Sequence, residues 1–353
     1  MAAIRKTTKL IHVGNVPVGG GSPVSVQSMT KTDTRDAAAT LRQIKALAGK
    51  GCEIIRVAVP DGDAAKSLSK IKKGSPIPVI ADIHFDWRLA LESIKQGVDG
   101  LRINPGNIGS DWKIKELVRA LKDRPIPVRV GVNAGSLEKE LLRRYGHPGP
   151  RALVESALKE IALLEKAGYE EIKVSLKASN VPTTVEAYRL FSKRAGYPLH
   201  IGISEAGPPG TGTIKSAVGL GILLSEGIGD TMRVSLTGNP VEEVRTAYRI
   251  LQSLGIRESG PEIISCPTCG RTTIGIEGLA REVEKRLRKI KKPVKVAVMG
   301  CVVNGPGEAR EADFGITGAK GRGMIFKKGK MLKTVKEKDL LDALMEEIEA
   351  WKP

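Results

Sequence analysis

The chain has 353 residues, of which 41% are hydrophobic and 3% aromatic, and its formal net charge is +18. This length predicts one large domain plus a smaller one rather than a single small core. The scarcity of aromatic residues argues against single-stranded nucleic-acid binding, which depends on stacked rings. We therefore expect no nucleic-acid partner. The positive charge then indicates an anionic substrate, an acidic protein partner or simply a solvated surface.

No apolar run approaches the ~20 residues that a membrane-spanning helix requires. The first residues show no apolar core followed by a cleavage site. We therefore expect a cytoplasmic protein without a membrane partner. Thiols stay reduced in that compartment, so cysteines grouped in the sequence indicate a metal or redox site rather than disulfides.

From about residue 24 to residue 254, short apolar runs alternate with polar loops and amphipathic helices. Helices are predicted, for example, over residues 40–48, 90–96, 151–167 and 241–254. Repeated strand–helix units predict an α/β protein with a (β/α)₈ TIM barrel. A doubly wound open sheet is the alternative, but no Gly-x-Gly-x-x-Gly turn follows the first strand. Eight runs are apolar enough to be parallel strands buried on both faces, namely residues 24–29, 53–59, 78–83, 100–104, 127–133, 171–178, 199–205 and 231–236.

The alternation ends at residues 255–261, where we place the domain boundary. Residues 1–258 would form the barrel domain, and residues 259–353 would form a smaller α+β domain. In the smaller domain we expect helices near 278–290 and 336–351 and strands near 294–299, 314–317 and 323–327.

Three cysteines near the end of the chain indicate a metal site. Cys266 and Cys269 form Cys-Pro-Thr-Cys, and Cys301 opens a run that ends at Glu308. Three thiolates are one short of a closed zinc site or an all-cysteine iron–sulfur site. The fourth position is then open or filled by a weaker oxygen ligand such as Glu308, which suits catalysis better than structural support. A thiol redox pair or half of a zinc ribbon is the alternative.

Cationic side chains interrupt the predicted strands, at the end of the barrel where active sites lie. They are Arg56, Arg102, Arg129, Lys177 and Arg233. An internal ion pair could explain any one of them, but the same strands carry few carboxylates, chiefly Asp82 and Glu205. The surplus charge predicts a polyanionic ligand, most simply a diphosphate. Asp82, His84 and Glu205 are left for proton transfer or for ordering hydroxyl groups.

Distinctive segments are spread over nearly the whole chain. In the barrel region they are Ser25-Val-Gln-Ser-Met-Thr, Ala81-Asp-Ile-His-Phe, Leu101-Arg-Ile-Asn-Pro-Gly-Asn, Gly131-Val-Asn-Ala-Gly-Ser-Leu-Glu, Ser175-Leu-Lys-Ala-Ser and Gly202-Ile-Ser-Glu-Ala-Gly. Later ones are Leu224-Ser-Glu-Gly-Ile-Gly-Asp-Thr-Met-Arg-Val-Ser, Cys266-Pro-Thr-Cys-Gly-Arg and Gly300-Cys-Val-Val-Asn-Gly-Pro-Gly-Glu-Ala. Together they resemble the 4-hydroxy-3-methylbut-2-enyl diphosphate synthase family of the methylerythritol phosphate route to isoprenoids.

The resemblance implies a barrel joined to a smaller domain that holds a 4Fe–4S cluster. It implies an iron–sulfur oxidoreductase that opens the ring of 2-C-methyl-D-erythritol 2,4-cyclodiphosphate with two electrons and loss of water. Glu205 would be the proton donor, with Asp82 or His84 as second choices. The matching cluster ligands are Cys266, Cys269, Cys301 and Glu308, and the matching substrate-binding residues are Arg56, Arg102, Arg129, Asn133, Lys177, Arg233 and Ser235.

The chain has no room for the extra domain of some relatives, so the resemblance implies the two-domain form and a homodimer. Its basic charge predicts an acidic electron donor such as flavodoxin or ferredoxin. One rival is a redox-silent barrel synthase whose cysteines hold structural zinc. A second rival, a non-catalytic nucleic-acid binder, leaves the cations at the strand ends unexplained.

Overall fold

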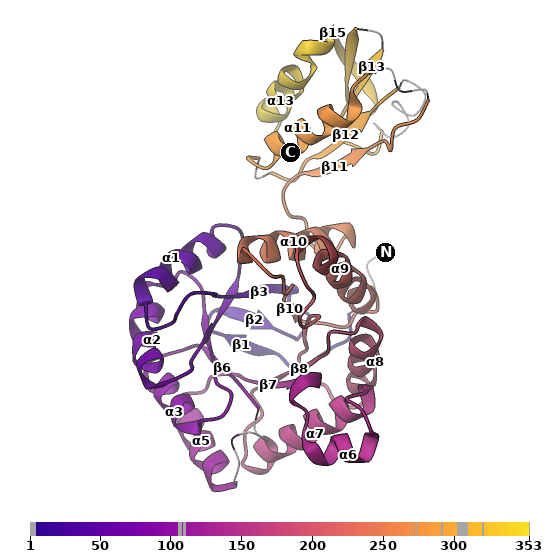
Figure 1. Ribbon diagram of the computed structural model, residues 1–353. Helices are drawn as coiled ribbons and strands as arrows, with labels where there is room; N and C mark the ends of the chain where they lie inside the picture. Colours follow the sequence, from indigo (N-terminus) through magenta and orange to yellow (C-terminus); the bar gives the residue numbers. More distant parts are fainter. Residues whose placement is uncertain are drawn as a thin grey trace. The chain divides into compact units, whose positions relative to one another are not determined.

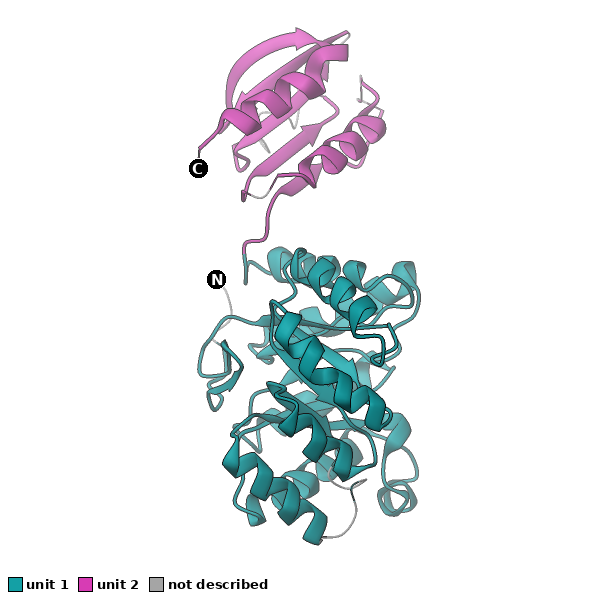
Figure 2. Cartoon of the chain, turned by 90° about the vertical axis from the view of Figure 1, so that its left-hand side faces the viewer, with its two compact units in different colours: residues 1–257 teal, residues 258–353 magenta. Residues whose placement is uncertain are grey.

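The computed structural model describes residues 5–104, 108, 111–270, 272, 274–290, 292–301, 310–319 and 321–352. The chain divides into two compact units, residues 1–257 and residues 258–353, which Figure 2 colours separately. Within the described ranges, no helix combines the length and the apolar character needed to cross a membrane.

Eight parallel strands form the centre of the first unit, and helices surround them (Figure 1). Their order in the sheet is β8-β7-β6-β5-β4-β3-β10-β9. A parallel bridge between Val174 and Leu199 joins the two ends of this order, so the sheet closes and the predicted (β/α)₈ barrel is confirmed. The strands are β3 (Ser25–Met29), β4 (Ile54–Ala58), β5 (Val79–Asp82), β6 (Gly100–Ile103), β7 (Val128–Asn133), β8 (Ile172–Lys177), β9 (His200–Ile201) and β10 (Thr231–Met232).

Several barrel helices begin after an aspartate or asparagine that caps a free backbone amide. The capping side chains are Asp36, Asp61, Asp86, Asn180 and Asn239. Each cap ends the connection between a barrel strand and the next helix, and the connections that end at Asp86 and Asn239 carry the cavity residues His84 and Ser235. The helices of this unit are α1 (Ala37–Ala48), α2 (Gly62–Gly74), α3 (Trp87–Lys95), α5 (Asp111–Asp123), η1 (Ala134–Ser136), α6 (Lys139–Tyr145), α7 (Pro150–Lys166), α8 (Val181–Ser192), α9 (Pro209–Ser225) and α10 (Pro240–Ser253).

A short antiparallel hairpin, β1 (Ile11–Val13) and β2 (Val16–Val18), covers one end of the barrel. Its buried side chains pack with Ile54 and Ile80, which lie near the beginnings of β4 and β5. The opposite end, where the strands finish, is the end at which barrel active sites are built.

The second unit has one five-stranded sheet in the order β11-β12-β13-β14-β15. The first three strands are parallel, and the last two pairings are antiparallel. Helices α11 and α13 pack against the sheet in one apolar core, to which Phe314 and Trp351 contribute an edge-to-face ring contact. The elements are β11 (Glu262–Ser265), α11 (Ile276–Leu287), β12 (Lys295–Met299), β13 (Phe314–Ala319), β14 (Arg322–Lys327), β15 (Lys330–Lys336), η2 (Glu337–Asp339) and α13 (Leu340–Ala350).

The structure differs from the predicted elements in detail. Strands β9 and β10 have two residues each, because the chain turns at Ser204 and Glu205 and runs irregularly from residue 233. Strand β15 was not predicted; its side chains are exposed or half-buried, so its sequence lacks an apolar alternation.

Candidate functional site

A cavity of about 420 Å³ opens at the carboxyl ends of the barrel strands. The structure brings together here all the barrel side chains that the sequence singles out. They are Arg56, Asp82, His84, Arg102, Arg129, Asn133, Lys177, Glu205, Arg233 and Ser235. Ser175, Ser204, Gly207, Leu236 and Thr237 complete the lining.

Asp82 anchors two of the cavity's arginines. Its carboxylate lies 3.4 Å from Arg56 Nε and 3.3 Å from Arg102 Nη1, on neighbouring strands. Burial alone would raise the pKa of Asp82, but the charges of these two arginines outweigh it and bring the pKa below its ordinary value. Asp82 is therefore ionised at neutral pH.

His84 follows β5 and faces the same arginine pair. Its Nε2 atom lies 2.8 Å from Arg102 Nη1, and arginine can only donate, so this ring nitrogen accepts. Burial lowers the pKa of His84, the charge of Asp82 opposes this, and the charge of Arg102 adds to the lowering. The imidazole is therefore neutral near pH 7.

Arg129 and Lys177 are deeply buried cations of the cavity wall, being 2% and 7% exposed. Burial, reinforced by neighbouring cations, lowers the pKa of both groups well below the ordinary values. Arg129 Nη1 donates to Ser175 Oγ at 3.3 Å, but Arg129 Nε and Nη2 have no hydrogen-bond partner in the described part of the chain. Buried donors without a partner are unfavourable. An anionic ligand would supply acceptors for these Arg129 donors and would offset the buried positive charge.

Two glycines provide the space in which the cations lie. A Cβ atom on Gly131 would stand 2.6 Å from Arg102 Nε, and one on Gly202 would stand 2.6 Å from the Arg233 carbonyl oxygen and 2.7 Å from Lys177 Nζ. These separations are shorter than real Cβ contacts, so a larger residue would displace Arg102 at the first position, and Lys177 together with the backbone after β10 at the second.

Glu205 lies exposed at the cavity rim, in the turn after β9. Its φ of 52° is left-handed, which costs a non-glycine residue roughly 1–2 kcal/mol. The turn continues to Gly207, whose carbonyl accepts the Thr237 N–H at 3.0 Å and so connects the loops after β9 and β10. Strained residues of this kind gather at functional sites.

Sequence reasoning missed Met29 and Glu243. Met29 Sδ accepts from Arg56 Nη2 at 2.9 Å and lies 3.5 Å from Arg233 Nη1. Glu243, which is 1% exposed, contacts Arg233 from α10. A signal was available for Glu243, because it occupies the same helical stripe as the buried Ala247 and Ile250.

The cysteine loops of the second unit follow two adjacent parallel strands. Ser265, the last residue of β11, pairs with Val298 of β12, and the Cys266 N–H donates to the Val298 carbonyl at 3.1 Å. Cys301 lies two residues beyond the end of β12. Both loops therefore start at the same edge of the sheet.

A second contact joins these loops. The Cys269 N–H donates to Thr272 Oγ1 at 3.1 Å, and a Cβ atom on Gly300 would stand 3.0 Å from Thr272 Cγ2. Gly300 precedes Cys301, so the segments that carry Cys269 and Cys301 touch through Thr272. Cys269 is exposed, and the other two thiols of the set are half-buried.

Glu308, the predicted fourth ligand, lies outside the described residues. Among those that are described, no three His, Cys, Asp or Glu side chains are close enough to hold a metal ion. The thiols are nonetheless a donor set that suits soft metals and iron–sulfur clusters.

Comparison with known proteins covers both units. Residues 8–248 match the GcpE TIM-barrel domain, and residues 262–350 match the GcpE protein C-terminal domain. The chain is 63% identical over 344 residues to 4-hydroxy-3-methylbut-2-en-1-yl diphosphate synthase (flavodoxin) of Thermodesulfovibrio yellowstonii, covering 98% of this chain and 99% of that protein. It is 62% identical over 346 residues to the enzyme of the same name from Geobacter sulfurreducens, covering 98% of each.

Among solved structures, the chain is similar to dihydropteroate synthase of Yersinia pestis, with a TM-score of 0.52 and 11% identity. That match covers 70% of this chain and 100% of the other, and at this identity it concerns the barrel fold alone. The family matches, in contrast, extend over both units and the relatives match nearly end to end, so this chain belongs to the GcpE family.

Proposed function

We propose that the chain catalyses the reaction for which its curated relatives are named, the formation of 4-hydroxy-3-methylbut-2-en-1-yl diphosphate. The substrate would be 2-C-methyl-D-erythritol 2,4-cyclodiphosphate, which takes up two electrons and protons, opens its ring and loses water. The observation that carries this proposal is the cation-lined cavity at the carboxyl ends of the barrel strands of a GcpE-family chain.

The cavity cations would bind the diphosphate. The unpaired Arg129 donors and the Lys177 ammonium lie where buried positive charge has too little protein counter-charge. Arg56 and Arg102 are held by Asp82, so their guanidinium groups are oriented before a ligand arrives. Fixing the diphosphate in this way would place the carbon skeleton reproducibly at the cavity mouth.

Glu205 is our candidate proton donor for the oxygen that leaves. Asp82 is a weaker candidate, because Arg56 and Arg102 keep it ionised. His84 is also weaker, because its Nε2 atom accepts from Arg102 and the ring is neutral. Glu205 differs from both, since it lines the cavity but forms no ion pair with a cavity arginine in the described structure.

Cys266, Cys269 and Cys301, with Glu308, would hold a 4Fe–4S cluster. When bound, such a cluster supplies electrons one at a time and acts as a Lewis acid. The arrangement of the two cysteine loops at one sheet edge supports this assignment. Three thiolates plus a weaker oxygen ligand leave the displaceable position that the reaction needs.

Anaerobic purification followed by analysis of iron, sulfide and zinc tests this function. We expect about four irons and four sulfides per chain, a brown colour, and turnover of the cyclodiphosphate with a chemical reductant. A colourless protein with stoichiometric zinc would contradict it and would favour the redox-silent synthase.

We further propose that flavodoxin or ferredoxin donates the electrons and that two copies of the chain form a homodimer. The net charge of +18 suits an acidic donor, as does the word flavodoxin in the relatives' names. Turnover with the protein donor should fall as salt rises, whereas turnover with a small uncharged reductant should not. Light scattering at several concentrations should give twice the chain mass.

A further inference from the structure

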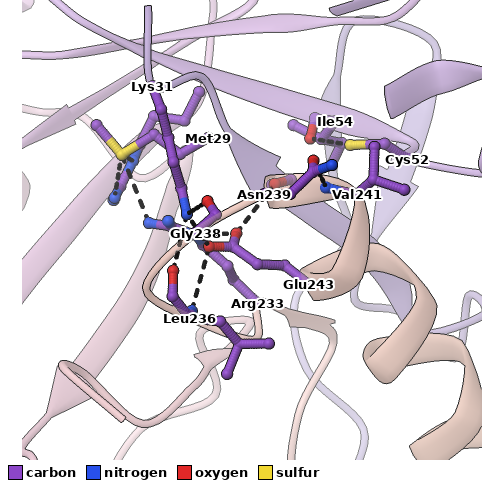
Figure 3. A network of polar contacts seen from close by, with 12 residues as sticks. Met29, Lys31, Cys52, Ile54, Arg233, Leu236, Gly238, Asn239, Val241 and Glu243 are labelled. Carbon is purple, nitrogen blue, oxygen red and sulfur yellow. Dashed lines mark hydrogen bonds and ion pairs between the residues drawn. The ribbon is translucent and has the colours of Figure 1, made fainter. Parts of the chain in front are cut away.

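Glu243 of α10 lies behind the cavity wall and contacts several residues that form or support it (Figure 3). Its Oε2 atom lies 3.3 Å from Arg233 Nε and accepts from Ser28 Oγ at 3.1 Å. Its Oε1 atom accepts the Leu236 N–H at 3.2 Å and lies 3.2 Å from Lys31 Nζ. A single buried carboxylate thus joins β3, the segment after β10 and α10.

The contact with Arg233 fixes the orientation of a cavity cation. Glu243 holds the guanidinium at Nε, and Met29 Sδ lies 3.5 Å from Nη1. The same sulfur accepts from Arg56 Nη2 at 2.9 Å, so it stands between two like charges. Two restraints on one planar group leave the guanidinium little freedom to rotate.

The contact with Leu236 fixes the loop after β10. Lys31 Nζ, paired with Glu243, donates to the Leu236 carbonyl at 2.7 Å and to the Gly238 carbonyl at 2.5 Å. Leu236 is therefore held at both its N–H and its carbonyl group. Ser235 precedes it directly and lines the cavity.

We propose that Glu243 is a positioning residue for anion binding, which sets the place of Arg233 and Ser235 without touching the ligand. This inference rests on the proposed function, since it concerns how the cavity holds a diphosphate. Glu243 is not among the residues that line the cavity, and its carboxylate forms ion pairs with both Arg233 and Lys31.

Glu243→Gln removes the charge and keeps the shape. Removing a residue that supports a metal ligand typically lowers affinity or activity by about 10–100-fold. By analogy, we expect KM for the cyclodiphosphate to rise by a factor of that size. The value of kcat should change by less than about threefold, because the reacting carbons are handled elsewhere. Calorimetric titration of the holoenzyme with inorganic pyrophosphate should show the same loss of affinity.

Glu242→Gln is the matched control. Glu242 precedes Glu243 in the same helical turn but is half-exposed, with Arg245 as its ion-pair partner. It should retain wild-type KM and pyrophosphate affinity. An unchanged KM and affinity in Glu243→Gln, or a loss of kcat alone, would overturn the proposal.

A double-mutant cycle distinguishes positioning from general destabilisation. In an Arg233→Met background, Glu243→Gln should weaken pyrophosphate binding less than it does in the wild type; full additivity would contradict an action through Arg233.

If Glu243→Gln does not fold, Glu243→Asp is the second variant, because it keeps the charge and withdraws the carboxylate. It should bind pyrophosphate more weakly than the wild type, and unchanged binding would overturn the proposal. Wild-type protein that binds pyrophosphate but lacks turnover would refute only the proposed reaction. Wild-type protein with turnover but without pyrophosphate binding would refute only the role of Glu243 in anion binding, and absence of both would refute both.

Discussion

The barrel cavity and the cysteine edge of the second unit are both built where parallel strands end, yet the protein arranges them to different degrees. Asp82 in the cavity and Glu243 behind its wall hold three cavity arginines at distances of 3.3–3.4 Å. At the cysteine edge, Cys269 is exposed on a loop and the described residues form no ready metal site. Ion pairs between strands thus preorganise the cations, whereas thiols on loops are expected to depend on the metal they bind.

Replacing Cys269 by serine should give the largest effect in this comparison. We expect loss of the visible spectrum and of turnover, because a thiolate ligand disappears, with pyrophosphate binding to the barrel retained. Iron analysis measures the loss of the cluster, and calorimetric titration measures the retained pyrophosphate binding. Cys52→Ala is the control, since Cys52 is buried in the barrel core and should leave the iron content unchanged. Full iron and turnover in Cys269→Ser would refute its assignment as a ligand.

Glu205→Gln should have the next largest effect. Loss of a general acid typically lowers kcat by about 10²–10⁴-fold, and binding should remain because no cavity cation in the described part of the chain forms an ion pair with Glu205. Steady-state kinetics and pyrophosphate titration check both parts. Near-normal kcat with intact binding would remove Glu205 from the mechanism.

Arg102→Ala should act on binding and leave the second unit untouched. Charge-assisted hydrogen bonds contribute about 1.5–3 kcal/mol, so KM should rise roughly 10–100-fold while the spectrum stays unchanged. Arg88→Ala is a matched control, because Arg88 is exposed and pairs only with the neighbouring Asp86 among the ion pairs of the described structure. A lost spectrum in Arg102→Ala would show that this arginine is structural.

Glu160→Gln should have the smallest effect, on stability rather than on turnover. Glu160 of α7 is fully buried, and its carboxylate oxygens have no hydrogen-bond partner in the described ranges. Burial, with a contribution from Glu138, raises its pKa from 4.5 to about 8.

The folded protein therefore retains this proton where the unfolded chain has released it, so stability from this group is lost as pH rises from 4.5 towards 8. The variant should match the wild type near pH 4.5 and have a Tm a few degrees higher at pH 8. Parallel Tm curves across this range would contradict the assignment.

The fold could largely be predicted because parallel strands buried on both faces leave continuous apolar runs, and all eight barrel strands lie within the predicted ranges. The cavity residues could be nominated because cations inside such runs are conspicuous. The helical stripe of Ala247 and Ile250 could have indicated that Glu243 is buried, but its contacts with Arg233 and Lys31 could not be predicted, because they depend on the conformations of the segments that follow β10 and β3. The spacing of the cysteines indicates a metal, but it does not give the distances between thiols, which depend on loop conformation.

The cavity also depends on side chains that are missing. Gly131 and Gly202 have no Cβ atom, and the space this leaves is taken by Arg102 beside the first and by Lys177 and the Arg233 carbonyl beside the second. A designer who moved these cations onto another barrel without the two glycines would obtain the same charges pointing elsewhere. In a mutational scan, both glycine positions should therefore tolerate not even alanine. The binding site is thus specified partly by positions where the chain has no side chain.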